Sequence, residues 1–163
     1  MKAIFFLITA LFFSSLLLAQ NLCSVKNAQA YYYSVMPGDK PVTLDINGKE
    51  ENKILTRTNI SIYLNSTCVH TPVIFFSTLG KLKMKPEFIR VTSNKDEAGV
   101  DENGILKIIK ASKNTFLWKA IWVVQGRAAN FENEKIIIKG IIGSKKFNVS
   151  ILSPIKLQPV AMY

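Results

Sequence analysis

Few residues of this 163-residue chain have side chains that could do chemistry. The only imidazole is His70, and no serine lies in a recognisable nucleophile turn that could join it in a Ser–His–Asp arrangement. The sequence also lacks a glycine-rich phosphate loop, a G-x-S-x-G elbow and an H-E-x-x-H zinc motif. We therefore expect no catalytic residues and no cofactor, and a hydrolase that uses His70 is the less favoured alternative.

Four carboxylates gather in the polar segment between residues 94 and 103. They are Asp96, Glu97, Asp101 and Glu102. Oxygen ligands in a loop could bind calcium, but their spacing does not match the EF-hand pattern. A glycosidase needs two acids that face each other across a cleft, which one loop rarely supplies. We therefore interpret these acids as those of a solvated hairpin loop and expect no metal site.

Positive charge is the clearest compositional signal. The chain has 21 Lys and Arg against 11 Asp and Glu, a net charge of +10 at pH 7, which favours anionic partners such as lipid phosphate or acidic polysaccharide. Lys81, Lys83 and Lys85 alternate with apolar residues and would project from one side of a strand. They are the candidate anion-binding residues, and the alternative is a solvated edge strand whose lysines oppose aggregation.

The N-terminal residues 1–19 have the features of a secretory signal peptide. Lys2 gives the positive start, an apolar run follows, and Ala19 supplies the small residue before the cleavage site. A membrane anchor would need about 20 apolar residues, and lipidation at Cys23 would require a small residue where Leu22 stands. We expect cleavage near Ala19, no transmembrane segment afterwards, and a periplasmic, cell-surface or secreted product.

Export sets how the two cysteines and the charge are interpreted. In an oxidising compartment the pair Cys23 and Cys68 is most simply a disulfide, and the alternative is two free thiols. A redox pair would normally be C-x-x-C, and a metal site would need further Cys or His ligands. Nucleic acid becomes a less natural partner than an envelope protein, an anionic glycan or a lipid.

Short runs of strand-forming residues separated by turn signals fill the rest of the chain. Asn47-Gly48 and Gly143-Ser144 each predict a hairpin between flanking strands. Residues 105–110 and 115–125 are expected to form another hairpin. Phe116–Val124 (FLWKAIWVV) is largely apolar at both alternating sets of positions, which predicts a central strand whose tryptophans pack in the core.

This pattern predicts an all-β fold with about eight short strands after a cleaved signal peptide. An antiparallel β-sandwich, immunoglobulin-like or related, is the expected architecture, and a partly closed barrel is the alternative. The expected organisation is a signal peptide over residues 1–19, an N-terminal connecting segment over 20–29 and a single β-sandwich domain over 30–163.

Three stretches resemble small exported β-sandwich proteins of the Bacteroidetes. They are Arg57–Leu64 (RTNISIYL), Leu117-Trp118-Lys119 and the Ala19-Gln20 junction. The resemblance implies an immunoglobulin-like or similar domain in a bacterial periplasm or at a cell surface. It carries no active residues, because most such proteins have no known function. We expect a non-enzymatic envelope or surface module with a binding or structural role, and a binder of anionic lipid or polysaccharide as the alternative.

Overall fold

The computed structural model describes residues 23–35, 43–44, 50–51, 57–125 and 131–159. These ranges contain strands and no helix, so the all-β prediction is confirmed. In this part of the chain no helix is long and apolar enough to cross a membrane. The strands are β1 (Val25–Val35), β2 (Thr43–Leu44), β3 (Glu50–Glu51), β4 (Arg57–Ser66), β5 (Val73–Leu79), β6 (Leu82–Lys83), β7 (Ile89–Arg90), β8 (Lys95–Val100), β9 (Leu106–Lys110), β10 (Phe116–Gln125), β11 (Lys135–Ile142), β12 (Lys145–Leu152) and β13 (Ile155–Lys156).

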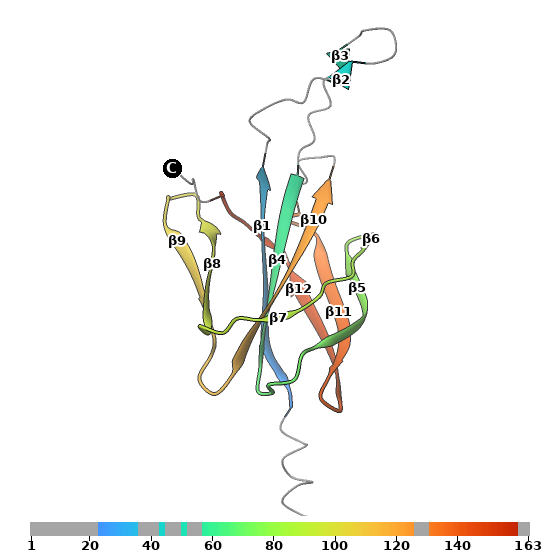
Figure 1. Ribbon diagram of the computed structural model, residues 1–163, viewed down its shortest axis with the longest axis vertical. Helices are drawn as coiled ribbons and strands as arrows, with labels where there is room; N and C mark the ends of the chain where they lie inside the picture. The colour runs from blue at the N-terminus through green and yellow to red at the C-terminus, as the bar shows by residue number, and fades with distance from the viewer. Residues whose placement is uncertain (1–22, 36–42, 45–49, 52–56, 126–130, 160–163) are drawn as a thin grey trace, which may run out of the picture.

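Nine of these strands form two sheets. One sheet has the order β13-β1-β4-β10-β7 and the other the order β12-β11-β5-β6, while β2–β3 and β8–β9 are separate pairs. Neighbouring strands are antiparallel except β13, which runs parallel to β1. Figure 1 shows β1, β4 and β10 side by side, with β8 and β9 on one side of them and β5, β11 and β12 on the other.

Two of the predicted hairpins are present. β11 and β12 pair along their full length on either side of Gly143-Ser144, as expected. β2 and β3 pair on either side of Asn47-Gly48, although the turn residues themselves lie outside the described ranges. In both cases the turn dipeptide indicated the pairing of the strands on either side of it.

The hairpin expected between residues 105–110 and 115–125 is wrong. β9 pairs with β8, and β10 pairs with β4 and β7. The cause is a tight turn before β9, in which the Asp101 carboxylate accepts hydrogen bonds from the backbone N–H groups of Asn103 and Ile105, each at 2.9 Å. Gly104 follows with φ of 77°, a conformation that glycine adopts without strain.

The predicted disulfide is confirmed. Cys23 and Cys68 are bonded, with their Cα atoms 5.0 Å apart and a sequence separation of 45. The bridge ties the chain just before β1 to the segment after β4, and the Thr67 N–H donates to the Ser24 carbonyl beside it at 3.0 Å. β1 begins at Val25, inside the segment 20–29 that was expected to be a connection.

The two sheets contribute to one apolar core. Trp118 lies in it with 2% of its surface exposed, and Trp122 packs against it partly buried. The remaining buried members from the two sheets are Ala30 and Tyr32 of β1, Ile60, Ile62 and Leu64 of β4, Ala120 of β10, Leu79 of β5, Ile136 and Ile138 of β11, and Ile151 of β12.

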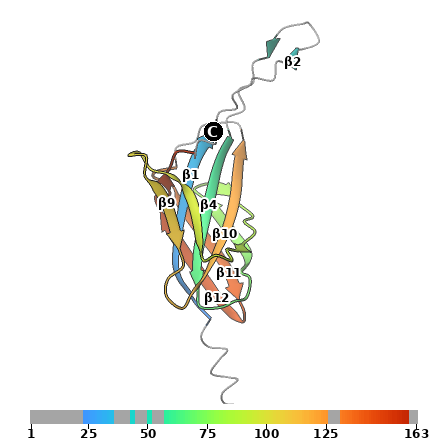
Figure 2. The same ribbon diagram turned by 60° about the vertical axis from the view of Figure 1, so that its left-hand side comes forward.

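The opposite face of the five-stranded sheet is covered as well. Tyr31, Tyr63 and Leu117 are buried there in a second cluster with Ala98 of β8 and Ile109 of β9. Figure 2 shows the β8–β9 hairpin lying along this face. Every residue of β4 after the first is therefore buried, and the central strands have protein on both faces.

We predict that replacing both cysteines with serine lowers the free energy of unfolding by about 4 kcal/mol, because the unfolded chain regains the entropy of an open loop of about 45 residues. The measurement is urea unfolding of the double variant and of the native protein. The native protein unfolded in the presence of reductant is the matched control and should behave like the variant. An unchanged midpoint in the double variant would contradict a stabilising role for the bridge.

Candidate functional site

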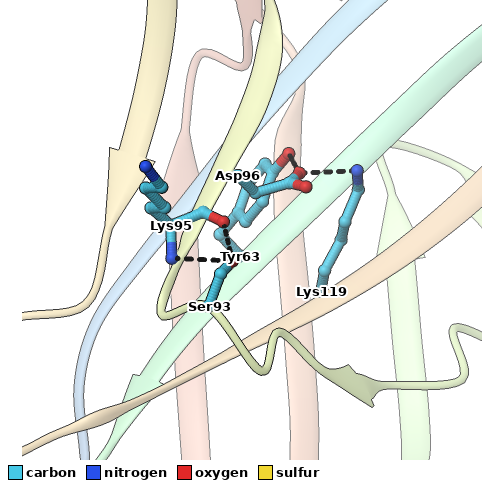
Figure 3. A network of polar contacts seen from close by, with 5 residues as sticks. All are labelled: Tyr63, Ser93, Lys95, Asp96 and Lys119. Carbon is cyan, nitrogen blue, oxygen red and sulfur yellow. Dashed lines mark hydrogen bonds and ion pairs between the residues drawn. The ribbon is translucent and has the colours of Figure 1, made fainter.

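A polar network joins the β8–β9 hairpin to the five-stranded sheet. Asp96 of β8 accepts a hydrogen bond from the Tyr63 hydroxyl at 2.6 Å and pairs with the Lys119 ammonium group, also at 2.6 Å and through the same oxygen, Oδ2. Lys119 lies on β10, and its Nζ stands 5.7 Å from the centre of the Tyr63 ring. Figure 3 shows Tyr63 and Lys119 converging on Asp96 from the two neighbouring strands.

The network is buried enough to perturb Tyr63. Only 1% of this residue is exposed. Burial, and then the hydrogen bond to the Asp96 carboxylate, raise the pKa of Tyr63 well above its ordinary value of 10.0. Its hydroxyl is therefore held protonated as a donor, which suits a structural tie between layers rather than proton transfer near neutral pH.

The four acids of the 94–103 segment do not converge on one site. Asp96 is committed to the network with Tyr63, and Asp101 caps the turn before β9. Glu97 and Glu102 are exposed, on β8 and in that turn. In the described part of the chain no group of three or more His, Cys, Asp and Glu side chains could hold a metal ion. The segment is also not the loop that we expected, because Lys95–Val100 forms β8 and pairs with β9.

The residues proposed from sequence for hydrolysis and anion binding lie apart. His70 is exposed in the connection between β4 and β5. Lys81, Lys83 and Lys85 are all exposed, but only Lys83 lies in a strand. Lys81 occupies the turn before β6, and Lys85 follows that strand. The stripe on one strand is thus replaced by three lysines around the β5–β6 hairpin.

The outer face of the four-stranded sheet, the face turned away from the shared core, places Lys83 among other lysines. Lys83 pairs with Thr78, and Thr78 pairs with Ile137, so these three side chains share a face. Because side chains alternate along a strand, Lys139 of β11 lies on this face too. Lys139 pairs with Phe76 of β5, and its Nζ lies 5.3 Å from the centre of the Phe76 ring.

A pocket of about 290 Å³ opens beside this face, where β5 bulges. The register shifts between Lys139 and Gly140, which oppose Phe76 and Ile74, so that Phe75 is the extra residue. Phe75 is 62% exposed and Phe76 is 43% exposed. The pocket is lined by Ile74, Phe75, Phe76, Met84, Lys85, Pro86 and Glu87.

We call one set of residues the basic aromatic face. Its members are Phe75, Phe76, Lys83, Lys85, Lys139 and Lys146. Lys146 of β12 belongs to it because it pairs with Ile141, which lies on the same face of β11 as Lys139. The sequence pointed to Lys146 as a possible extension of the lysine stripe, but not to Lys139 or the two rings, since a run such as Ile74-Phe75-Phe76 usually lies in a core. The bulge that exposes Phe75 has no signal in the local sequence.

A scan against protein-family models, a search of curated proteins and a search of solved structures found no match to this chain.

The Tyr63–Asp96 contact gives a stability prediction. Replacing Tyr63 with phenylalanine removes a hydrogen bond to a charged group and should lower the free energy of unfolding by about 2 kcal/mol at pH 7. Tyr31→Phe is the matched control, because the Tyr31 hydroxyl donates to Gln29 of its own strand and its loss does not separate the layers. Urea unfolding measures both. Equal losses in the two variants would contradict a specific role for the Asp96 contact.

The same contact predicts a pH dependence. The pKa of Tyr63 is raised in the folded protein, so above about pH 10 the unfolded chain binds fewer protons than the folded one. Stability should therefore fall as the pH rises above about 10, and less steeply in Tyr63→Phe than in the native protein. Unfolding curves between pH 8 and pH 11, at about one-unit steps, measure the difference, and parallel pH profiles would count against it.

Proposed function

We propose that this chain is an exported, non-enzymatic β-sandwich module of immunoglobulin-like type that binds an acidic polysaccharide of the cell envelope through the basic aromatic face. The supporting observation is the composition of the four-stranded sheet. Its strands contain no Asp or Glu and carry the lysines Lys83, Lys135, Lys139, Lys145 and Lys146. A sheet with one sign of charge attracts a polyanion.

The spread of these lysines favours a polymer over a single small anion. Neighbouring strands lie about 4.8 Å apart, so Lys83 on β6 and Lys146 on β12 are offset by about 14 Å across the sheet. Lys83 is in register with Ser150 of β12, four residues from Lys146, which adds about 13 Å along the strands. Lys139 lies between them on β11. One phosphate or carboxylate cannot contact all three, whereas successive acidic groups along a chain can.

The exposed rings supply the second part of the proposed recognition. Aromatic faces carry partial negative charge and attract electropositive groups, which include the C–H groups on the flat side of a sugar ring. Phe75 and Phe76 stand beside Lys85 and Lys139 in this way. A sugar that stacks on a ring can thus place its carboxylate near a lysine.

Two features support a binding role rather than catalysis. In the described residues the acids are separated, and His70 lies in the β4–β5 connection away from them.

The Cys23–Cys68 bridge and the leader-like residues 1–19 support export. Two sheets with a shared core support the sandwich.

The binding experiment uses the mature protein and an immobilised uronic acid polymer, with neutral dextran and vesicles of anionic phospholipid as separate arms. We expect binding to the acidic polymer alone, weakening as salt rises because exposed charges are screened. Lys83→Ala combined with Lys139→Ala should weaken it about tenfold, since two exposed ionic contacts contribute about 1.4 kcal/mol together. Binding only to the vesicles would assign the surface to lipid and contradict the proposal.

Two further variants distinguish the contribution of the lysine charges to affinity from that of the aromatic rings. Lys107→Ala combined with Lys110→Ala changes the net charge equally, but on β9 in the separate β8–β9 hairpin, and should leave affinity nearly unchanged. Phe75→Ala should weaken binding without altering its salt dependence, because the ring carries no charge. Equal losses in both lysine pairs would show a general effect of charge, not a site.

Export is tested by the intact mass of the protein recovered from bacteria that express the whole sequence. We expect a chain that begins near Gln20 and gains the mass of two hydrogen atoms on reduction, because the Cys23–Cys68 disulfide opens. A mass that retains residues 1–19 in the exported fraction would contradict cleavage. An added acyl mass on Cys23 would show that the exported product is a lipoprotein.

A further inference from the structure

One edge of the five-stranded sheet is open along half of β10. β10 pairs with β4 over its whole length but with β7 only near its start. The Val91 N–H of the segment after β7 donates to the Leu117 carbonyl at 2.9 Å, so the odd-numbered residues of β10 direct their backbone groups toward this edge. Further along, the N–H and C=O groups of Ile121, Val123 and Gln125 face it, and no described residue pairs with them.

This edge lacks the features that usually prevent edge-to-edge pairing. Exposed edges in monomeric proteins are short, bulged or charged. The other outermost strands follow this rule: β6, β7 and β13 have two residues each, β9 carries Lys107 and Lys110, and β12 begins with Lys145-Lys146. Residues 120–125 (AIWVVQ) contain no charge, proline or glycine, and Ile121 and Val123 are 54% and 38% exposed.

We propose that this edge of β10 is a self-association site, and that its occupant is β10 of a second copy of the chain. An antiparallel pair about a two-fold axis at Val123 places Val123 opposite Val123 of the partner subunit. It also places Ile121 opposite the partner's Gln125 and Gln125 opposite the partner's Ile121. These are the residues whose backbone groups face the edge, so each open N–H and C=O gains a partner.

The side chains of this register are complementary. On the face toward the core, Trp122 lies opposite the partner's Val124, an aromatic–β-branched pair of the kind that stabilises antiparallel strands. On the other face, Val123 meets its own copy. No charged residue enters the pairing, so the positive charge of the two copies is not brought together at the contact.

The open stretch of β10 is long enough to pair with the same stretch of a second copy. The pairing covers residues 121–125 of each chain and ends before Lys119, where β7 takes over the edge. A contact of this length buries much less than the ~1,600 Å² of a standard interface. We therefore expect a dimer that forms with rising concentration rather than a permanent one.

Sedimentation equilibrium and amide hydrogen exchange of the mature protein test the site. We expect a monomer–dimer equilibrium in which the amides of Ile121, Val123 and Gln125 become protected as concentration rises. The amides of Trp122 and Val124 point to β4 and should be protected at every concentration. A monomer at all concentrations, or protection of the edge amides that does not change with concentration, would overturn the proposal.

Val123→Lys should raise the dissociation constant at least tenfold, because two lysines would meet on the axis. Leu152→Lys, at a 71% exposed position on β12, introduces the same charge elsewhere and should leave the equilibrium unchanged. Ile121→Lys tests the same edge if Val123→Lys does not fold, as judged by circular dichroism. A dimer weakened only by Leu152→Lys would place the contact on the other sheet and refute this one.

Discussion

The rest of the structure depends on the burial of β4 on both faces. On one face Ile60, Ile62 and Leu64 are fully buried in the core between the sheets. On the other, polar side chains are buried as well, and a buried polar group destabilises the fold unless it finds a hydrogen-bond partner. Tyr63 finds Asp96, and Asn65 accepts hydrogen bonds from Ser112 and Thr115 in the turn before β10. The β8–β9 hairpin and this turn therefore complete the central sheet.

Features that follow from local sequence patterns or from residue counts could be predicted. Alternation along β4, the Asn47-Gly48 and Gly143-Ser144 turns and the cysteine count indicated an all-β fold, two hairpins and the disulfide, all of which are present. The covered outer face was not predictable, because alternating polar residues usually mark a solvated strand. Its cover comes from β8, a strand about 30 residues further along the chain, whose acids were interpreted as a loop. The half-buried Asp96 is thus the partner of the buried Tyr63, which no local pattern indicates.

The two sheets differ in how they are covered, and this difference locates the basic aromatic face. The five-stranded sheet has the other sheet on one face and the β8–β9 hairpin on the other. For the four-stranded sheet, the described residues cover only the inner face, and Phe76 stays 43% exposed beside Lys139. The exposed Lys139 holds its ammonium group 5.3 Å from the centre of this ring, a cation–π contact. An exposed ring and a lysine therefore lie together on the outer face of this sheet.

The basic aromatic face and the open edge of β10 lie on different sheets and depend on different interactions. The binding proposed for the face would depend on exposed charges, which salt screens within a Debye length of about 8 Å at physiological ionic strength. The pairing proposed at Val123 would depend on backbone hydrogen bonds and apolar contacts, which salt screens little. A dimer through β10 would also carry two basic aromatic faces, so a polymer long enough to reach both would bind more tightly without any new contact. The proposed self-association and the proposed anion binding would thus reinforce each other, while each depends on residues the other does not use.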